Sequence, residues 1–310
     1  MDYQELEELR RRRWHQDGNA VRTLEAARGF MDEVGLCAMY PEPHQQAAPT
    51  FIGAWLGRGH SLPVARAAFA HPEAAEAEAM KMRLIRERAA YEWPLHDSVL
   101  LIATPVFPFF YALAADRGGR QQPTWAAGQK LSRLARDAWS EFERAKQPLS
   151  EEQLRRQLGK GVSEAALRRA LHELWQRLRV TLVDRNEEGA IWDALARSSQ
   201  QAVAQGEQLS VSAALSAMVS QFLDAMIAAE PAHIESFFSP LVGRAKVRDA
   251  VSALLAARQV SAVQVGSQNM LQITPEKIPI VPRPPRERPA AGDPRRQPLR
   301  PRRMPGRKPA

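Results

Sequence analysis

Apolar residues recur at helical spacing over much of the chain. In residues 19–35 they form one stripe that is closed by a glycine, Gly35. Residues 73–93 are rich in strong helix formers, and residues 209–229 are apolar on most sides, as in a buried helix. A further stripe runs through residues 124–146. These patterns predict a helical protein, and no internal repeat of fixed period is visible in its first 140 residues.

Residues 147–196 combine two short helices with a hairpin. Ser150 and Gln153 have the spacing of a capping box, and Gly159 is placed to end that helix in the left-handed conformation. Ser163 can cap the next helix. The segments VTLVD and AIWDAL then flank RNEEG, which is typical of two strands and their turn. The pattern predicts a helix-turn-helix followed by a two-stranded wing.

A second copy of this order is predicted at residues 232–274. HIESFFSPL indicates a short helix that ends at Pro240, and GRAKVRDAVSALLAARQV indicates a longer one. SAVQV and NMLQI, joined by GSQ, alternate apolar and polar residues as a half-buried hairpin does. The apolar face of the longer helix is expected to consist of Val247, Val251, Leu254 and Leu255.

The recurring order of helix, helix, strand, wing and strand resembles the winged helix-turn-helix superfamily. The chain is also similar in general organisation, and in phrases such as FFSPL, to the AlkZ-type crosslink-repair DNA glycosylases, which are built from several such modules. That resemblance implies a Gln-x-Gln or Gln-x-Asp catalytic motif. SQQAVAQ, at residues 199–205, contains neither triplet, so the resemblance assigns no catalytic residue here.

We therefore expect a mainly α-helical fold with small β-hairpins. Its expected parts are a helical N-terminal domain (1–146), a first winged helix (147–196), a helical connector (197–231), a second winged helix (232–274) and a disordered Pro/Arg-rich tail (275–310). The tail holds 11 of the 23 prolines and 11 Lys and Arg against 3 acidic residues, which accounts for the net charge of +8. It is interpreted either as a solubilising tail or as a polyanion-binding arm.

Composition narrows the class of protein further. A hydrophobic content of 45% and a charged content of 25% suit a soluble globular chain. The longest apolar run, residues 99–115, contains two prolines and is too short to span a bilayer, so we expect no membrane contact. No secretory signal opens the sequence, and Cys37 is the single cysteine, expected to be buried. We expect a cytoplasmic protein.

The exposed faces of the two longer helices supply candidate DNA contacts. They are Arg168, Arg169 and His172 in the first module, and Arg244, Lys246, Arg248 and Arg258 in the second. Such side chains bind phosphates and base edges when a helix enters the major groove. The alternative is a solvated helix face. Acidic residues in the first wing, at Asp184, Glu187 and Glu188, would repel phosphates. The second module is therefore the better candidate for DNA recognition.

Candidate catalytic groups are sparse. The seven histidines show no metal-ligand spacing, and no nucleophile motif accompanies them, so we expect no metal, no cofactor and no chemistry of the protein's own. The sequence favours a regulator or DNA-maintenance factor that binds double-stranded DNA. One alternative is a divergent DNA glycosylase that extrudes a base between modules. The other is a scaffold whose winged helices bind protein partners.

Overall fold

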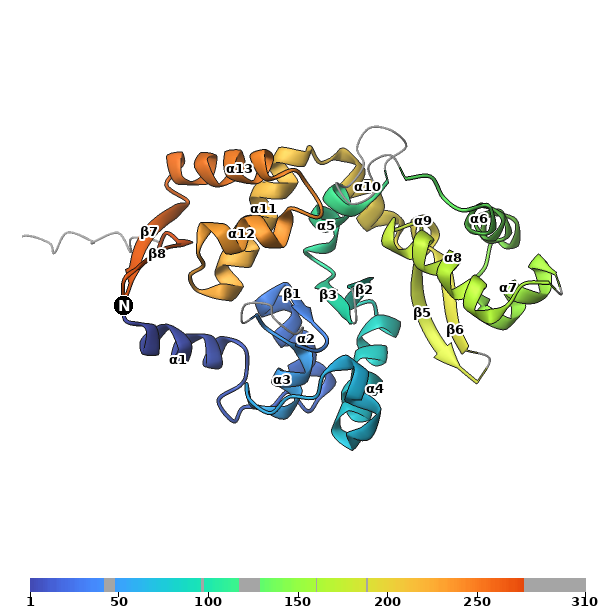
Figure 1. The fold of residues 1–310 in the computed structure, drawn as a ribbon, viewed down its shortest axis with the longest axis horizontal. Helices are drawn as coiled ribbons and strands as arrows, with labels where there is room; N and C mark the ends of the chain where they lie inside the picture. Colours follow the sequence, from blue (N-terminus) through green and yellow to red (C-terminus); the bar gives the residue numbers. More distant parts are fainter. Residues whose placement is uncertain (42–47, 96–97, 117–128, 160, 188, 276–310) are drawn as a thin grey trace, which may run out of the picture. The chain divides into compact units, whose positions relative to one another are not determined.

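The computed structural model describes residues 1–41, 48–95, 98–116, 129–159, 161–187 and 189–275. It is mainly helical, with small antiparallel sheets, as the sequence predicts (Figure 1). The same order of elements recurs in residues 24–103, 133–194 and 211–273, which we name the first, second and third repeats. In the first two, a helix and a short strand precede two helices and a two-stranded hairpin, and in the third a bridge residue replaces the short strand. The hairpin's second strand pairs both with the hairpin's first strand and with that short strand or bridge residue.

The first repeat contains a sheet that the hydrophobic pattern does not indicate. Its elements are α2 (Leu24–Val34), β1 (Leu36–Ala38), α3 (Phe51–Leu56), the short 3-10 helix η1 (Ala65–Ala70), α4 (Pro72–Arg86), β2 (Ala90–Pro94) and β3 (Val99–Ala103). Leu36 lies opposite Ile102, and Trp93 lies opposite Leu100, in the antiparallel order β1-β3-β2. The N-terminal region, expected to be helical, therefore adds three strands to its helices.

The second repeat follows the predicted pattern closely. It comprises α6 (Arg133–Ala145), β4 (Leu149–Ser150), α7 (Glu151–Leu158), α8 (Glu164–Gln176), β5 (Val180–Asn186) and β6 (Gly189–Ala194). The capping box is confirmed: Gln153 N donates to Ser150 Oγ at 3.1 Å, and Ser150 N donates to Gln153 Oε1 at 3.0 Å. Gly159 does end α7, but its φ of 102° and ψ of 163° lie outside the left-handed helical conformation, so that detail was wrong.

The third repeat uses a single bridge in place of the first strand. Its elements are α11 (Val211–Met226), α12 (Pro231–Phe238), α13 (Arg244–Ala256), β7 (Val260–Val265) and β8 (Gln268–Ile273), and Ala229 bridges to Leu271. The predicted helices and hairpin are confirmed. The expected apolar face of α13 needs one correction, because Leu254 is 4% exposed whereas Leu255 is 38% exposed. The buried side of the helix consists of Val247, Ala250 and Leu254.

Shared cores join the repeats. One apolar cluster contains residues of both the first and the third repeat, together with α5 (Phe107–Ala114) and α10 (Gln200–Gln208), which packs on α5. A second cluster fills the second repeat and includes Met82 and Ile85 of α4. The N-terminal α1 (Tyr3–Arg13) is fastened to the end of α11, because the buried Arg10 donates to the carbonyl oxygens of Met226 and Ala228 at 3.1 and 2.8 Å.

Two further expectations concern the C-terminal tail and contact with a membrane. The Pro/Arg-rich tail falls almost entirely in residues 276–310, which lie outside the described residues. Within the described residues, no helix by itself has the length and apolar character to cross a membrane, and α10 with α11 meets the criterion only as a pair bent by 113°.

Candidate functional site

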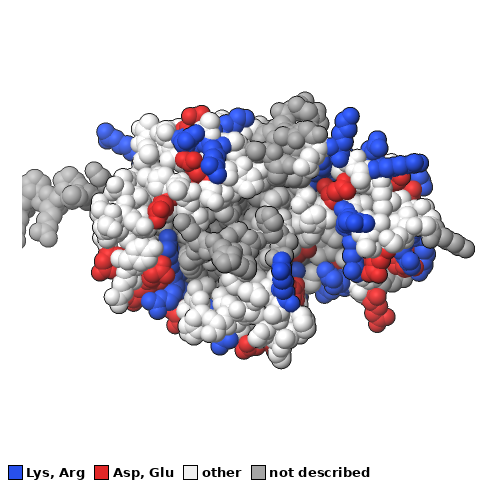
Figure 2. Space-filling model, viewed as in Figure 1, with Lys and Arg blue, Asp and Glu red and all other residues white. Residues whose placement is uncertain are grey.

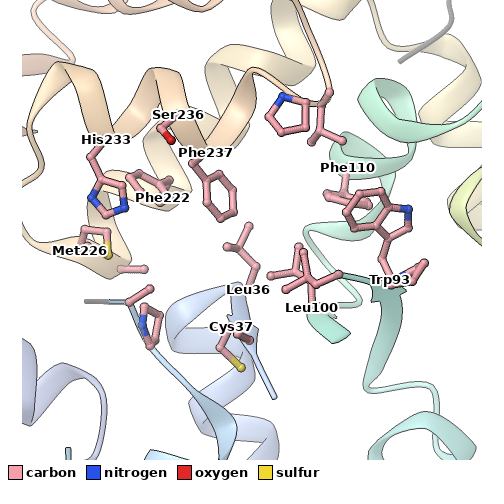
Figure 3. A pocket seen from close by; sticks show the side chains of 18 of the residues that line it. Leu36, Cys37, Trp93, Leu100, Phe110, Phe222, Met226, His233, Ser236 and Phe237 are labelled. Atoms are coloured by element: carbon pink, nitrogen blue, oxygen red, sulfur yellow. The ribbon is translucent and has the colours of Figure 1, made fainter. Parts of the chain in front are cut away.

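A cavity of about 670 Å³ lies between parts of all three repeats (Figure 3). Its walls come from the first repeat's sheet, from α5, from α8 of the second repeat and from α11 and α12 of the third. Its size is within the range of roughly 300–1,000 Å³ that is usual for small-molecule sites. The side chains labelled in Figure 3 are Leu36, Cys37, Trp93, Leu100, Phe110, Phe222, Met226, His233, Ser236 and Phe237.

The pleat of β1 decides which side chains enter the cavity. Leu36 points into the cavity towards Phe237, whereas the Cys37 sulfur points away from it (Figure 3). The Cys37 Sγ lies 3.7 Å from Met31 Sδ in the core, and burial raises the pKa of the thiol. The prediction that Cys37 is buried is therefore confirmed, and the thiolate needed for nucleophilic chemistry is disfavoured.

Aromatic rings form two sides of the cavity. Trp93 of β2 and Phe110 of α5 meet edge to face, with ring centroids 5.5 Å apart. Phe222 of α11 and Phe237 of α12 form the other pair, with centroids 4.8 Å apart. Trp93 of the first repeat and Phe237 of the third repeat therefore present aromatic surface to the cavity from two directions, with Phe110 and Phe222 buried behind them.

Few polar groups reach this apolar lining. They are His172 and Gln176 of α8, and His233 and Ser236 of α12. Burial, with a smaller effect of the Arg10 charge, lowers the pKa of His233 to about 4, so its imidazole is neutral at pH 7. Burial also lowers the pKa of His172, against an opposing effect of Glu173. None of the described lining residues is a lysine, arginine, aspartate or glutamate.

The C-terminal half of α8 is held against β2 of the first repeat. Trp175 Nε1 donates to the Glu92 carbonyl at 2.9 Å, and Trp93 Nε1 donates to the Gln176 carbonyl at 3.0 Å. These reciprocal bonds tie the second repeat to the first and turn His172 and Gln176 towards the cavity. This part of α8 is thus engaged in packing between repeats.

The cations at the start of α8 have different surroundings. Arg168 is exposed, but its guanidinium lies 2.5 Å from Glu164 Oε1 and 3.5 Å from Glu151 Oε2. Arg169 is exposed. In the adjoining hairpin, Asp184 is paired with Arg86 of α4, so one of the carboxylates expected in the wing has a cationic partner from the first repeat. Glu187 is exposed, and Glu188 lies outside the described residues.

The cations of α13 lie around its N-terminal half, which we name its basic end. Arg244 and Arg248 lie on one side of the helix and Lys246 lies roughly 160° from both, with the exposed Asp249 between Arg248 and Lys246 on the solvent side. Arg244, Lys246 and Arg248 are exposed, and none of them makes an ion pair with a described residue. Arg258 is also exposed and lies just after the helix, with a φ of 57°. No side chain caps α13, and its first turn has no acidic residue. Cations near a helix N-terminus oppose the helix dipole, so folding alone does not favour this placement.

No group of three or more His, Cys, Asp or Glu side chains in the described part of the chain is arranged to hold a metal ion. Sequence reasoning assigned DNA contact to His172, which the structure places at the cavity, and it missed the cavity itself. Trp93, Phe110 and Phe237 each look like ordinary core aromatics in the sequence, and no local signal marks them as neighbours of one open space.

Comparison with known proteins gave a likeness among solved structures. No protein-family model matches the sequence, and no curated protein matches it. Among solved structures, the DNA glycosylase AlkZ of Streptomyces sahachiroi aligns with a TM-score of 0.59 and 13% identity, over 88% of this chain and 70% of that one. This likeness confirms the predicted relationship to AlkZ at the level of fold.

Proposed function

We propose that this protein binds double-stranded DNA and that its three repeats are winged-helix modules. In this proposal, the repeats at residues 133–194 and 211–273 overlap the expected modules at 147–196 and 232–274 and add a helix before each, and residues 24–103 form a third module. The order of elements supports the assignment, because two helices followed by a hairpin are the parts of a helix-turn-helix with a wing. The AlkZ likeness in fold is consistent with such an arrangement.

The observation that carries the proposal is the basic end of α13, where Arg244, Lys246 and Arg248 are exposed and make no ion pair with a described residue. This helix is the second of its helix pair, the one that enters the major groove in helix-turn-helix proteins. Its cations have no described acidic partner to give up, and the helix dipole adds positive potential at the same end. Phosphates would supply negative charge to these three cations, which the one carboxylate of α13, Asp249, cannot balance by itself.

The other candidate contacts are secondary in this proposal. Arg258 lies beyond the C-terminal end of α13, away from its basic end, and can supply a separate phosphate contact. Arg168 has to be drawn away from Glu164 and Glu151 before it can meet a phosphate. His172 lies at the cavity beside Trp175, whose ring centroid is 6.2 Å away. We therefore assign the main contact to the third repeat.

A salt titration with labelled duplex tests the proposal. The variant Arg244→Ala/Lys246→Ala/Arg248→Ala should bind more weakly than the wild type, by at least about tenfold near 100 mM salt. Each lost phosphate contact should also reduce the slope of log K against log salt by about 0.9, so three contacts set a limit of about 2.7. Fluorescence anisotropy measures both quantities. Unchanged affinity would reassign α13 to protein contacts, and absence of duplex binding by the wild type would overturn the proposal.

A second candidate function is excision of a damaged base. The AlkZ likeness in fold and the cavity between repeats favour it, because such enzymes place an extruded base in a pocket. Incubation with alkylated duplex, followed by detection of abasic sites, distinguishes the candidates. Base release that is lost when Ala232, which lines the cavity, is replaced by Trp would support the enzyme; intact alkylated bases would support binding alone.

A further inference from the structure

The cavity has the properties of a binding site for a free small molecule. Its volume of about 670 Å³ is that of a site for a drug-sized ligand. Most of its described lining is apolar, from Leu36, Leu100 and Met226 as well as the aromatic rings. An open space of this kind costs a protein the dispersion contacts and apolar burial that a filled core would provide. An apolar ligand would restore them.

The aromatic pairs select the shape of that ligand. Trp93 and Phe237 offer ring surface on two sides of the cavity, and each is backed by a buried ring, Phe110 and Phe222 respectively (Figure 3). Aromatic partners gain stabilisation beyond area burial when a second ring lies offset or edge to face with them. A flat, unsaturated molecule uses such walls better than a branched aliphatic one.

The polar groups select the charge of the ligand. Gln176, Ser236 and the neutral imidazole of His233 can each donate or accept a hydrogen bond. A charged ligand would enter without an oppositely charged partner among the described lining residues, and burying an unpaired charge is costly. A neutral ligand with one or two hydrogen-bonding groups meets both conditions.

We propose that the cavity binds a neutral, flat, mostly unsaturated small molecule with one or two hydrogen-bonding groups. This site is distinct from the basic end of α13, and the inference does not depend on DNA binding. Because the lining comes from all three repeats, the ligand would contact α8 and α12 together and would stabilise the folded chain by binding it selectively.

The experiment uses the full chain and two matched fluorescent probes. N-phenylnaphthylamine is neutral and fluoresces strongly in apolar surroundings, and anilinonaphthalene sulfonate has the same ring skeleton with an added negative charge. The neutral probe should bind saturably with one site per chain, and the anionic probe at least about tenfold more weakly, which corresponds to about 1.4 kcal/mol. Absence of saturable binding, or equal binding of both probes, would overturn the proposal.

A cavity-filling variant locates the probe. Ala232 lines the cavity but is exposed on α12, so Ala232→Trp can occupy the opening without cutting into the core. It should weaken binding of the neutral probe at least about tenfold. Ala253→Trp, at an exposed position of α13 outside the lining, is the matched control and should bind as the wild type does.

A second filling variant covers the case in which the first is unstable. Ser236→Trp starts from another exposed lining residue of the same helix, and thermal melts report whether each variant is folded. Folded filling variants that still bind the neutral probe with wild-type affinity would place the probe elsewhere and overturn the inference.

Discussion

The helices α8 and α13 occupy the same place in their repeats but have different surroundings. Both are the second helix of a helix pair and both lead into a hairpin. The start of α8 is capped by Ser163, carries Glu164 in its first turn and pairs Arg168 with carboxylates. The start of α13 has neither a side-chain cap nor an acidic residue, and its cations are unpaired within the described structure.

The difference teaches that position in a repeat does not define the role of a helix. The α8 helix uses its C-terminal half to hold the first repeat, through Trp175 and Gln176. The main contacts of α13 are with α11, α12 and β7, all of the third repeat, so its opposite face stays open to solvent. Figure 2 shows Lys and Arg side chains over both regions. The two helices differ in ion pairing, because Arg168 of α8 pairs with Glu164 and Glu151, whereas the cations of α13 make no ion pair with a described residue.

The largest expected effect comes from a charge-matched pair of triple variants. Arg155→Ala/Arg156→Ala/Arg168→Ala removes three positive charges from the second repeat, as the α13 triple does from the third. Arg155 and Arg156 share one carboxylate, Glu152, at 2.7 and 3.1 Å, so part of their charge is already offset locally. We expect less than about threefold loss of duplex affinity, against at least about tenfold for the α13 triple.

Duplex anisotropy at several salt concentrations measures both triples. An equal loss of affinity for the two would mean that net charge alone governs binding, and the proposed distinction between the helices would not hold.

The next effect concerns the tie between α8 and β2. Trp175→Phe keeps an aromatic ring but removes the indole N–H that donates to the Glu92 carbonyl. We expect the free energy of unfolding to fall by about 0.5–1.5 kcal/mol, the usual net value of a hydrogen bond. Urea denaturation measures it. Trp139→Phe is the control, since Trp139 is also partly buried in this repeat but makes no hydrogen bond with a described residue. Equal losses for the two variants would argue against a specific tie.

The smallest expected effect is a pH dependence of stability caused by His233, which lies on the cavity side of the third repeat. The pKa of His233 is lowered from 6.5 to about 4 in the folded chain, mainly by burial. As the pH falls, the imidazole is therefore protonated in the unfolded chain before it is protonated in the folded chain. Stability from this group is present above about pH 6.5 and is lost as the pH falls towards about 4. His233→Gln should therefore lose less thermal stability than the wild type between these pH values.

The melting temperature at pH 7 and at pH 4.5 gives that comparison. His60→Gln, at an exposed position, is the control and should follow the wild type. A wild type and a His233→Gln variant that lose stability in parallel would show that His233 is not held neutral by the fold.

The sequence by itself determined the local features of this protein. The capping box of Ser150 and Gln153, the helix at 211–226 and the hairpin from Val260 to Ile273 follow from contacts between residues close in the chain. Their signals are complete within a short window, because caps, turns and alternation are set by neighbours. The apolar neighbours of Cys37 in the sequence also predicted that it is buried.

Only the tertiary structure decided the features that join distant segments. β1 has three residues, too few to show an alternation of apolar and polar positions. It becomes a strand because Leu36 pairs with Ile102, 66 positions later in the sequence. Leu254 and Leu255 are alike in the sequence, and the packing of α13 decides which one is buried. The cavity requires Leu36, Trp93, Gln176 and Phe237 together. Periodicity shows that a face is apolar, but the partner that covers it depends on contacts between elements far apart in the chain.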